Sequence, residues 1–109
     1  MDRVAFVYFN ETFAGTISES SEGFTFVYDT NYTLMGTPIG FNYPFSQLKY
    51  FSYNLFPLFE NLLSEGWLLD LQSSMQHIDK RDKFGILLNN GQDLIGAITV
   101  QKEIVWFVN

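Results

Sequence analysis

Two segments decide the fold of this chain: FPLFENLLSEGW (Phe56–Trp67) and DKFGILLNNGQDLIGAITV (Asp82–Val100). The first has the pattern of a short amphipathic helix. Pro57 suits its first turn, and Asn54 is placed just ahead as a candidate N-cap. The apolar side chains fall on one side of such a helix: Leu58, Phe59, Leu62 and Leu63. Gly66 is suited to end it, because glycine adopts the left-handed conformation without a steric penalty.

The second segment repeats this design and continues into a strand. The predicted helix spans Asp79–Asn90, with Asp82 near its start and Asn90-Gly91 at its end. Three apolar residues share one face of it: Phe84, Leu87 and Leu88. The following Asp93–Val100 is typical of a strand, in which the small Gly96-Ala97 pair allows a neighbouring backbone to approach closely.

The first third of the chain predicts a three-stranded antiparallel meander. Val4–Phe9 and Phe13–Ile17 flank a short polar break, as in a hairpin. Phe24–Tyr28 has aromatic residues at every second position and is the clearest strand. Residues 31–55 contain several glycines and prolines, which argues against a helix. We expect an extended segment around Ile39–Tyr43, followed by a loop that covers part of the domain.

Two further elements complete the expected architecture. Trp67–Ile78 has apolar residues at helical spacing, and Ile104–Val108 predicts a last strand that must be paired or covered. The order of the elements predicts an α+β fold, in which a small antiparallel sheet packs with about three short helices. With 109 residues, the chain has the length of a single domain, residues 1–109.

Composition narrows the classes of function. Apolar residues make up 47% of the chain and charged residues 17%, so we expect it to fold. The aromatic share of 18% indicates either a core built from large rings or rings on a surface that a partner covers. The net charge of −6 disfavours direct binding to nucleic acid or to an anionic membrane, because both depend on cationic side chains. The chain has no cysteine, no secretory signal and no apolar run of membrane-spanning length, so we expect a soluble, cytoplasmic protein.

Motifs for catalysis, cofactors or metals are absent from the sequence. His77 is the only histidine, and no nucleophile elbow or glycine-rich phosphate loop accompanies it. Glu60 and Glu65 would point in different directions on a helix, which favours solvated charges over a catalytic pair. Lys80, Arg81 and Lys83 favour a solvated helix entry over a phosphate site. We therefore expect no enzyme activity, no cofactor and no metal site.

Trp67 is the strongest candidate for a functional side chain. It directly follows Glu65-Gly66, where the first helix must end and the chain must turn. One interpretation is burial between the first two helices. The other is a ring that projects from the helix junction and anchors another protein, a role in which tryptophan is over-represented.

The two motifs together resemble the N-terminal subdomain of HipA-type serine/threonine kinases. The first motif is carried by Phe59, Asn61, Leu62, Leu63, Glu65, Gly66 and Trp67. The second is carried by Asp82, Phe84, Leu87, Leu88, Gly91, Asp93, Gly96, Ala97 and Val100. The opening part of that subdomain is similar to Gly15 and to the strand Phe24–Tyr28, which ends at Asp29. Ile39–Pro44 resembles a later stretch of the family that has the pattern lSlsxP. Ser64 departs from the family pattern, which usually has proline before the Glu-Gly pair.

The resemblance implies a non-enzymatic role in a toxin–antitoxin system. In HipA kinases this subdomain precedes a longer body that carries the phosphate-binding loop, the catalytic aspartate and the metal ligands, whereas this sequence stops at Asn109. It is similar to the free-standing HipS-type antitoxins, which are encoded with a shortened HipA-like kinase toxin (HipT-type) and a HipB-like DNA-binding protein. We therefore expect an antitoxin that inhibits such a kinase by protein–protein contact, and a ternary complex that reaches DNA only indirectly. The residues expected to bind the partner are those of the helix junction: Ser64, Glu65, Gly66, Trp67 and Leu68.

Three alternatives remain open. The chain could be an accessory subunit that completes and activates the kinase, and the direction of the change in autophosphorylation separates this from inhibition. It could be a gene fragment with a structural role only, which an adjacent kinase gene would argue against. A stand-alone enzyme ranks last, because no catalytic site is found.

Overall fold

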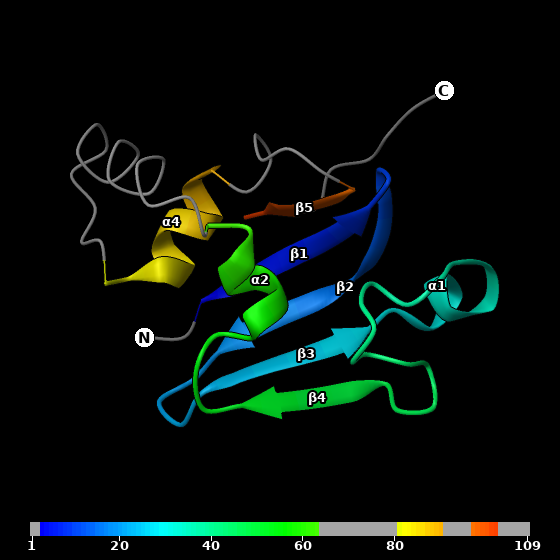
Figure 1. The fold of residues 1–109 in the computed structure, drawn as a ribbon, viewed down its shortest axis with the longest axis horizontal. Coiled ribbons are helices and arrows are strands. Elements are labelled where there is room, and N and C mark those ends of the chain that lie inside the picture. The colour runs from blue at the N-terminus through cyan, green and yellow to red at the C-terminus, as the bar shows by residue number, and fades with distance from the viewer. Residues whose placement is uncertain (1–2, 64–80, 91–96, 103–109) are drawn as a thin grey trace.

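The computed structural model of the chain describes residues 3–63, 81–90 and 97–102 (Figure 1). Its centre is a five-stranded antiparallel sheet with strand order β4-β3-β2-β1-β5. The strands are β1 (Val4–Phe9), β2 (Thr12–Glu19), β3 (Phe24–Tyr28), β4 (Lys49–Ser52) and β5 (Ile98–Gln101). The described helices are α1 (Thr30–Met35), α2 (Pro57–Asn61) and α4 (Lys83–Asn90). The fold is therefore α+β, as predicted.

The predicted meander of β1, β2 and β3 is confirmed. Asn10 and Glu11 form the tight β1–β2 turn with φ angles of 50° and 67°, a conformation that asparagine tolerates better than most residues. The β2–β3 turn closes with hydrogen bonds in both directions between the backbones of Ser20 and Gly23. Gly15 lies where β2 and β3 approach closely, and a Cβ there would collide with a backbone carbonyl oxygen of β3.

One face of the sheet carries the hydrophobic core. Alternate residues of the strands point to this face and pack against α2 and α4, which lie on the same side of the sheet (Figure 1). The Phe59 ring of α2 lies 6.0 Å from that of Phe26, and the Phe84 ring of α4 lies 5.4 Å from that of Phe24. Phe59, Phe84 and Leu87 are buried, as their predicted helix faces require. Burial of apolar surface contributes about 25 cal/mol per Å². Large rings bury the most surface, so they contribute most to the packing of α2 and α4 on the sheet.

The predictions for the two motif helices are mostly confirmed. Pro57 is the first residue of α2, but Phe56 occupies the N-cap position and Asn54 makes no capping bond, so the Asn54 prediction is wrong. The helix needs no side-chain cap because Pro57 removes one of the unpaired N–H groups. At α4, Asp82 accepts a hydrogen bond from the Gly85 N–H at 3.1 Å and so caps the helix.

The interpretation of residues 31–55 is wrong in two places. Asp29 ends β3 but also caps a helix, because its Oδ2 accepts a hydrogen bond from the Tyr32 N–H at 3.2 Å; the helix that follows is α1. The region Ile39–Tyr43 is a turn rather than an extended segment, since the Tyr43 N–H donates to the Gly40 carbonyl at 3.1 Å. The extended strand comes later, as β4. The expected covering role of the loop is confirmed, because Ile39 and Tyr43 are buried in the core.

Several predicted elements fall outside the described residues. These are the helix Trp67–Ile78, the first part of the strand Asp93–Val100 and the strand Ile104–Val108. Two predicted helix bounds are wrong: α2 ends at Asn61 rather than Gly66, and α4 begins at Lys83 rather than Asp79. The structure describes only the last residues of the predicted strand Asp93–Val100. They belong to β5, which begins at Ile98 and extends to Gln101. In the part of the chain that the structure describes, no helix has the length and apolar character needed to cross a bilayer.

Candidate partner-binding surface

The predicted partner-binding residues, Ser64–Leu68 with Trp67 among them, lie outside the described residues. The structure places the chain as far as Leu63, which follows α2 and is buried in the core. Their proposed role therefore remains a prediction from the sequence. The described residues contain a different candidate surface, which the motif search did not find.

A long segment of the chain is almost free of charge. From Thr30 to Phe59 the sequence has one charged residue, Lys49, and we call this range the uncharged segment. It includes α1, the following loop, β4 and the start of α2. The centres of protein–protein interfaces are depleted in charged residues and enriched in aromatic residues and methionine. The uncharged segment has this composition.

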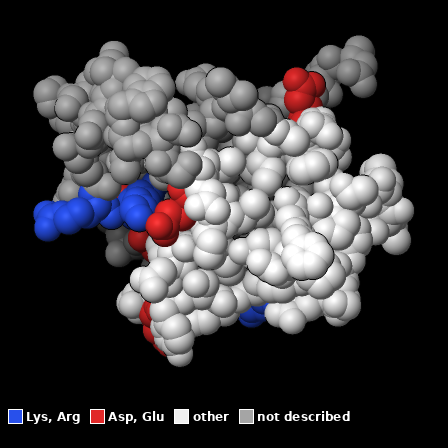
Figure 2. Space-filling model, viewed as in Figure 1, with Lys and Arg blue, Asp and Glu red and all other residues white. Residues whose placement is uncertain are grey.

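Large apolar side chains of the uncharged segment are exposed. Phe41 is 99% exposed, Leu34 85%, and Tyr53 79%. Three others share this property to a smaller degree: Met35, Leu48 and Phe51. In Figure 2 the charged side chains gather on the left of the view, while the surface to the lower right, over α1 and β4, is almost entirely uncharged. Six exposed large apolar side chains within one stretch of low charge make the uncharged segment the candidate partner-binding surface of the described residues.

Tyrosine hydroxyl groups hold the loop between α1 and β4 in place. The buried Tyr28 hydroxyl donates to the Tyr43 carbonyl at 2.6 Å and accepts from the Ile39 N–H at 3.0 Å. The Tyr32 hydroxyl donates to the Thr37 carbonyl, and the Tyr50 hydroxyl donates to the Pro44 carbonyl, each at 2.5 Å. The loop therefore presents its exposed side chains from a fixed backbone, which lowers the entropy lost on binding.

Burial raises the pKa of three tyrosines in this region. It raises the pKa of Tyr28 to about 12, against a smaller opposing effect of the hydrogen bond from Ile39. It also raises the pKa of Tyr43 and Tyr50. The Tyr28 hydroxyl consequently keeps its proton at neutral pH and remains a donor to the loop.

The charged residues form a separate cluster around Arg3, just before β1. The Arg3 guanidinium donates two hydrogen bonds to Glu19, at 2.7 and 2.8 Å, and two to Asp82, both at 2.9 Å. These bonds raise its pKa, with Glu19 making the larger contribution. Its Cζ also lies 5.3 Å from the ring centroid of Phe84. Arg3 thus ties β2 to the start of α4.

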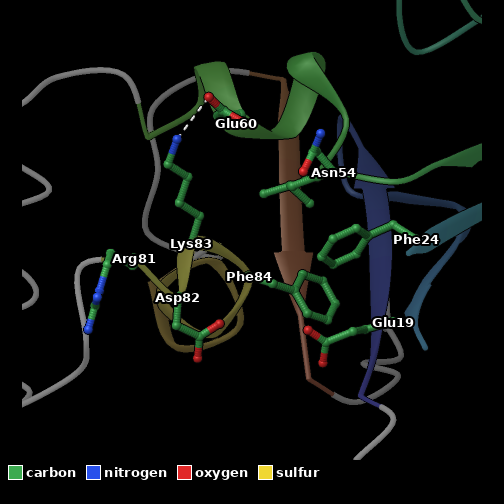
Figure 3. A pocket seen from close by; sticks show the side chains of 9 residues that line it. Glu19, Phe24, Asn54, Glu60, Arg81, Asp82, Lys83 and Phe84 are labelled. Atoms are coloured by element: carbon green, nitrogen blue, oxygen red, sulfur yellow. Dashed lines mark hydrogen bonds and ion pairs between the residues drawn. The ribbon is translucent and has the colours of Figure 1, made fainter. Parts of the chain in front are cut away.

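A pocket next to this cluster is lined by residues of β2, β3, α4 and the α2 region (Figure 3). Lys83 and Glu60 form an ion pair of 2.9 Å across it. Glu19 and Asp82 are engaged by Arg3, so these carboxylates serve the structure. Among the described residues, no three His, Cys, Asp or Glu side chains are placed to bind a metal ion. Three candidates for chemistry in the sequence lie outside those residues: His77, Lys80 and Glu65.

The comparisons with known proteins agree on one relationship. The family model of the HipA N-terminal domain matches residues 5–101. An uncharacterized protein of Haemophilus influenzae is 40% identical to this chain over 91 residues, which is 84% of each of the two. A solved structure of the N-terminal domain of HipA toxin matches with a TM-score of 0.75 and 34% sequence identity, over 94% of this chain and 93% of that one. The family match spans both the sheet and the uncharged segment.

Proposed function

The chain belongs to the HipA N-terminal domain family, and from this premise we propose that it is the antitoxin partner of a HipA-like serine/threonine kinase toxin. The solved relative is the N-terminal domain of a toxin. In this proposal the domain docks onto a kinase body and forms the interface that is internal in HipA-type kinases. It would act by contact and carry no catalytic group of its own.

The observation that carries this proposal is the exposed apolar surface of the uncharged segment. Leu34, Met35 and Phe41 are among the most exposed large apolar side chains of the described residues. A standard interface buries about 1,600 Å² in total. At about 25 cal/mol per Å² of apolar area, burial on this scale is a large favourable contribution to binding, which the entropic costs of association offset in part.

Inhibition of the kinase requires a feature that prevents a productive active site. We assign this role to the helix junction Ser64–Leu68, led by Trp67, because aromatic side chains at such turns are favoured as anchors. Trp67→Ala should then give a folded protein that no longer neutralises the kinase in growing cells. Wild-type neutralisation by this variant would refute the role of Trp67.

The test of the proposed function is co-expression with a HipA-like kinase from the same genome. We expect the two proteins to co-purify, and kinase autophosphorylation to fall when the purified chain is added. A HipB-like DNA-binding protein should join them in a ternary complex that associates with DNA indirectly. Absence of any complex with the kinase would refute the proposal.

Two substitutions connect the complex to the uncharged segment. Phe41→Ser removes a fully exposed ring, so it should leave the free energy of unfolding unchanged within about 0.5 kcal/mol and weaken kinase binding. Val4→Ser is the matched control, because Val4 is an exposed apolar residue outside the segment. Equal binding by both variants would exclude Phe41 from the interface.

The alternative function is that of an accessory subunit that completes and activates the kinase. The same docking surface would serve it, so binding alone does not separate the two functions. The autophosphorylation assay does, since an activator raises the signal that an inhibitor lowers. The net charge of −6 would also steer the chain toward a basic cleft of the kinase. The association rate should then fall as salt is added, and an association rate independent of salt would exclude steering.

A further inference from the structure

The outer edge of β4 is open among the described strands. β4 is the last strand in the sheet order, and β3 is its one described neighbour. The N–H of Tyr28 donates to the Leu48 carbonyl at 2.9 Å, so Tyr28 and Leu48 are a hydrogen-bonded pair. In an antiparallel ladder such pairs alternate with pairs whose N–H and C=O groups point away from each other.

This alternation determines which backbone groups face outward. Tyr50 and Ser52 pair with Phe26 and Phe24 and direct their N–H and C=O groups toward β3. Lys49 and Phe51 direct theirs away from the sheet. The Gln47 side-chain amide donates to the outward carbonyl of Lys49 at 2.6 Å, as this geometry requires. The outward N–H and C=O of Phe51 have no partner within the described ranges.

The side chains beside this edge specify what could add to it. Lys49 and Phe51 lie on the sheet face opposite the core, where Lys49 faces the exposed Val27. The half-exposed Phe51 ring meets the Tyr53 ring edge-on at a centroid distance of 5.0 Å. An added strand would therefore meet an aromatic surface and, two residues away, the single cation of the uncharged segment.

We propose that β4 binds an extended segment of the partner kinase by antiparallel strand addition, with an apolar side chain opposite Phe51 and a carboxylate opposite Lys49. Because the strands run in opposite directions, the kinase segment has the order apolar–x–acidic. Main-chain hydrogen bonds to Phe51 supply affinity, and the two side-chain pairs set the register. That the partner is a kinase rests on the proposed function. That the edge of β4 can accept a strand rests on the geometry alone.

Amide hydrogen exchange at single residues tests this mode of binding. The full-length chain is labelled with ¹⁵N and measured by NMR, alone and with the unlabelled HipA-like kinase. In the free protein the Tyr50 and Ser52 amides should be protected by β3, and the Phe51 amide should exchange fast. In the complex the Phe51 amide should slow at least about tenfold, with Tyr50 and Ser52 protected in both states.

Each other outcome of this experiment has a distinct meaning. If the complex forms and the Phe51 amide exchanges as fast as before, strand addition at β4 is refuted while the proposed function stands. If no complex forms, the proposed function fails, and this inference fails with it. If Phe51 is protected in the chain alone and the chain sediments as a dimer, the occupant of the edge is a second copy, which overturns the assignment to the kinase.

A charge reversal tests the predicted carboxylate. Lys49→Glu would place two like charges opposite each other, so the affinity for the kinase should fall about tenfold. Lys102→Glu is the matched control, because Lys102 is an exposed cation just after β5, at the other end of the sheet order. The affinity of this variant for the kinase should change less than about twofold. Equal losses in both variants would show an effect of net charge and would overturn the pairing with Lys49.

Discussion

The Tyr28 hydroxyl is the most informative single group to remove. It lies in the core, donates to the Tyr43 carbonyl at 2.6 Å and accepts from the Ile39 N–H at 3.0 Å. Tyr28→Phe keeps the ring, which stacks within 6.2 Å of the Tyr32 ring, and deletes only the oxygen. Both backbone groups of the loop would then be left buried without that partner.

The expected cost follows from these two orphaned groups. An unsatisfied buried donor or acceptor costs about 1–3 kcal/mol, so the free energy of unfolding should fall by about 3 kcal/mol. With a urea m-value of about 1.5 kcal/mol/M for a chain of this size, the urea midpoint should fall by about 2 M. The loss should also speed amide exchange in the loop around Phe41, because the backbone there is no longer held at Ile39 and Tyr43.

The matched control is Tyr50→Phe. The Tyr50 hydroxyl donates to the Pro44 carbonyl at an exposed position, where water can replace it. Its removal should cost about 0.5 kcal/mol. Urea unfolding followed by circular dichroism measures both variants. Equal midpoints for the two variants would refute the idea that the loop depends on a buried hydroxyl.

Three further predictions follow from the same interactions. The folded-state pKa of Tyr28 is about 12, above the ordinary tyrosine value of 10, so its contribution to stability is complete below pH 10 and should be lost as the pH rises from 10 to 12. Urea midpoints measured across this window should fall less steeply for Tyr28→Phe than for the wild type. Gly15→Ala should lower the free energy of unfolding by about 2–3 kcal/mol, because the new Cβ collides with backbone. Gly40→Ala is the control: its nearest neighbours are side chains, so it should lower that free energy by less than about 1 kcal/mol. Equal losses in the two variants would contradict the packing at Gly15. Asp82→Ala removes both the helix cap and the ion pair with Arg3, so it should lower the free energy of unfolding by about 1.5–2 kcal/mol. Asp82→Asn keeps a capping oxygen and should lower it by about half as much, as measured by thermal unfolding. A larger loss for Asp82→Asn than for Asp82→Ala would be inconsistent with the cap.

The parts of the fold that the sequence predicts well are those with a long periodic pattern. β3 and the faces of α2 and α4 were predicted because aromatic and aliphatic residues recur at the period of a strand or a helix. α1 was missed because it is a single short helix, held by the Asp29 cap and the packing of Tyr32. β4 was missed because four residues at a sheet edge carry too few alternations to show a period.

The candidate surface was only partly accessible from the sequence. The near absence of charge from Thr30 to Phe59 is visible there, and it is the signal that would have pointed to this region. What composition cannot show is which rings are buried. Phe41 is fully exposed while Tyr43, two residues further along the same loop, is buried, and it is the turn at Gly40–Tyr43 that separates them. The prediction for Ser64–Leu68 rests on the family motif and awaits its own test.

The position of β1 inside the sheet has a consequence for how the protein is made. β1 pairs on one side with β2, which follows it at once, and on the other with β5, near the far end of the described chain. A nascent chain on the ribosome must therefore expose one edge of β1 from the time β1 emerges until β5 has left the exit tunnel. The last backbone hydrogen bonds of the sheet form only after synthesis of nearly all the described residues, so an early partner or chaperone that covers this edge would limit aggregation of the unfinished chain.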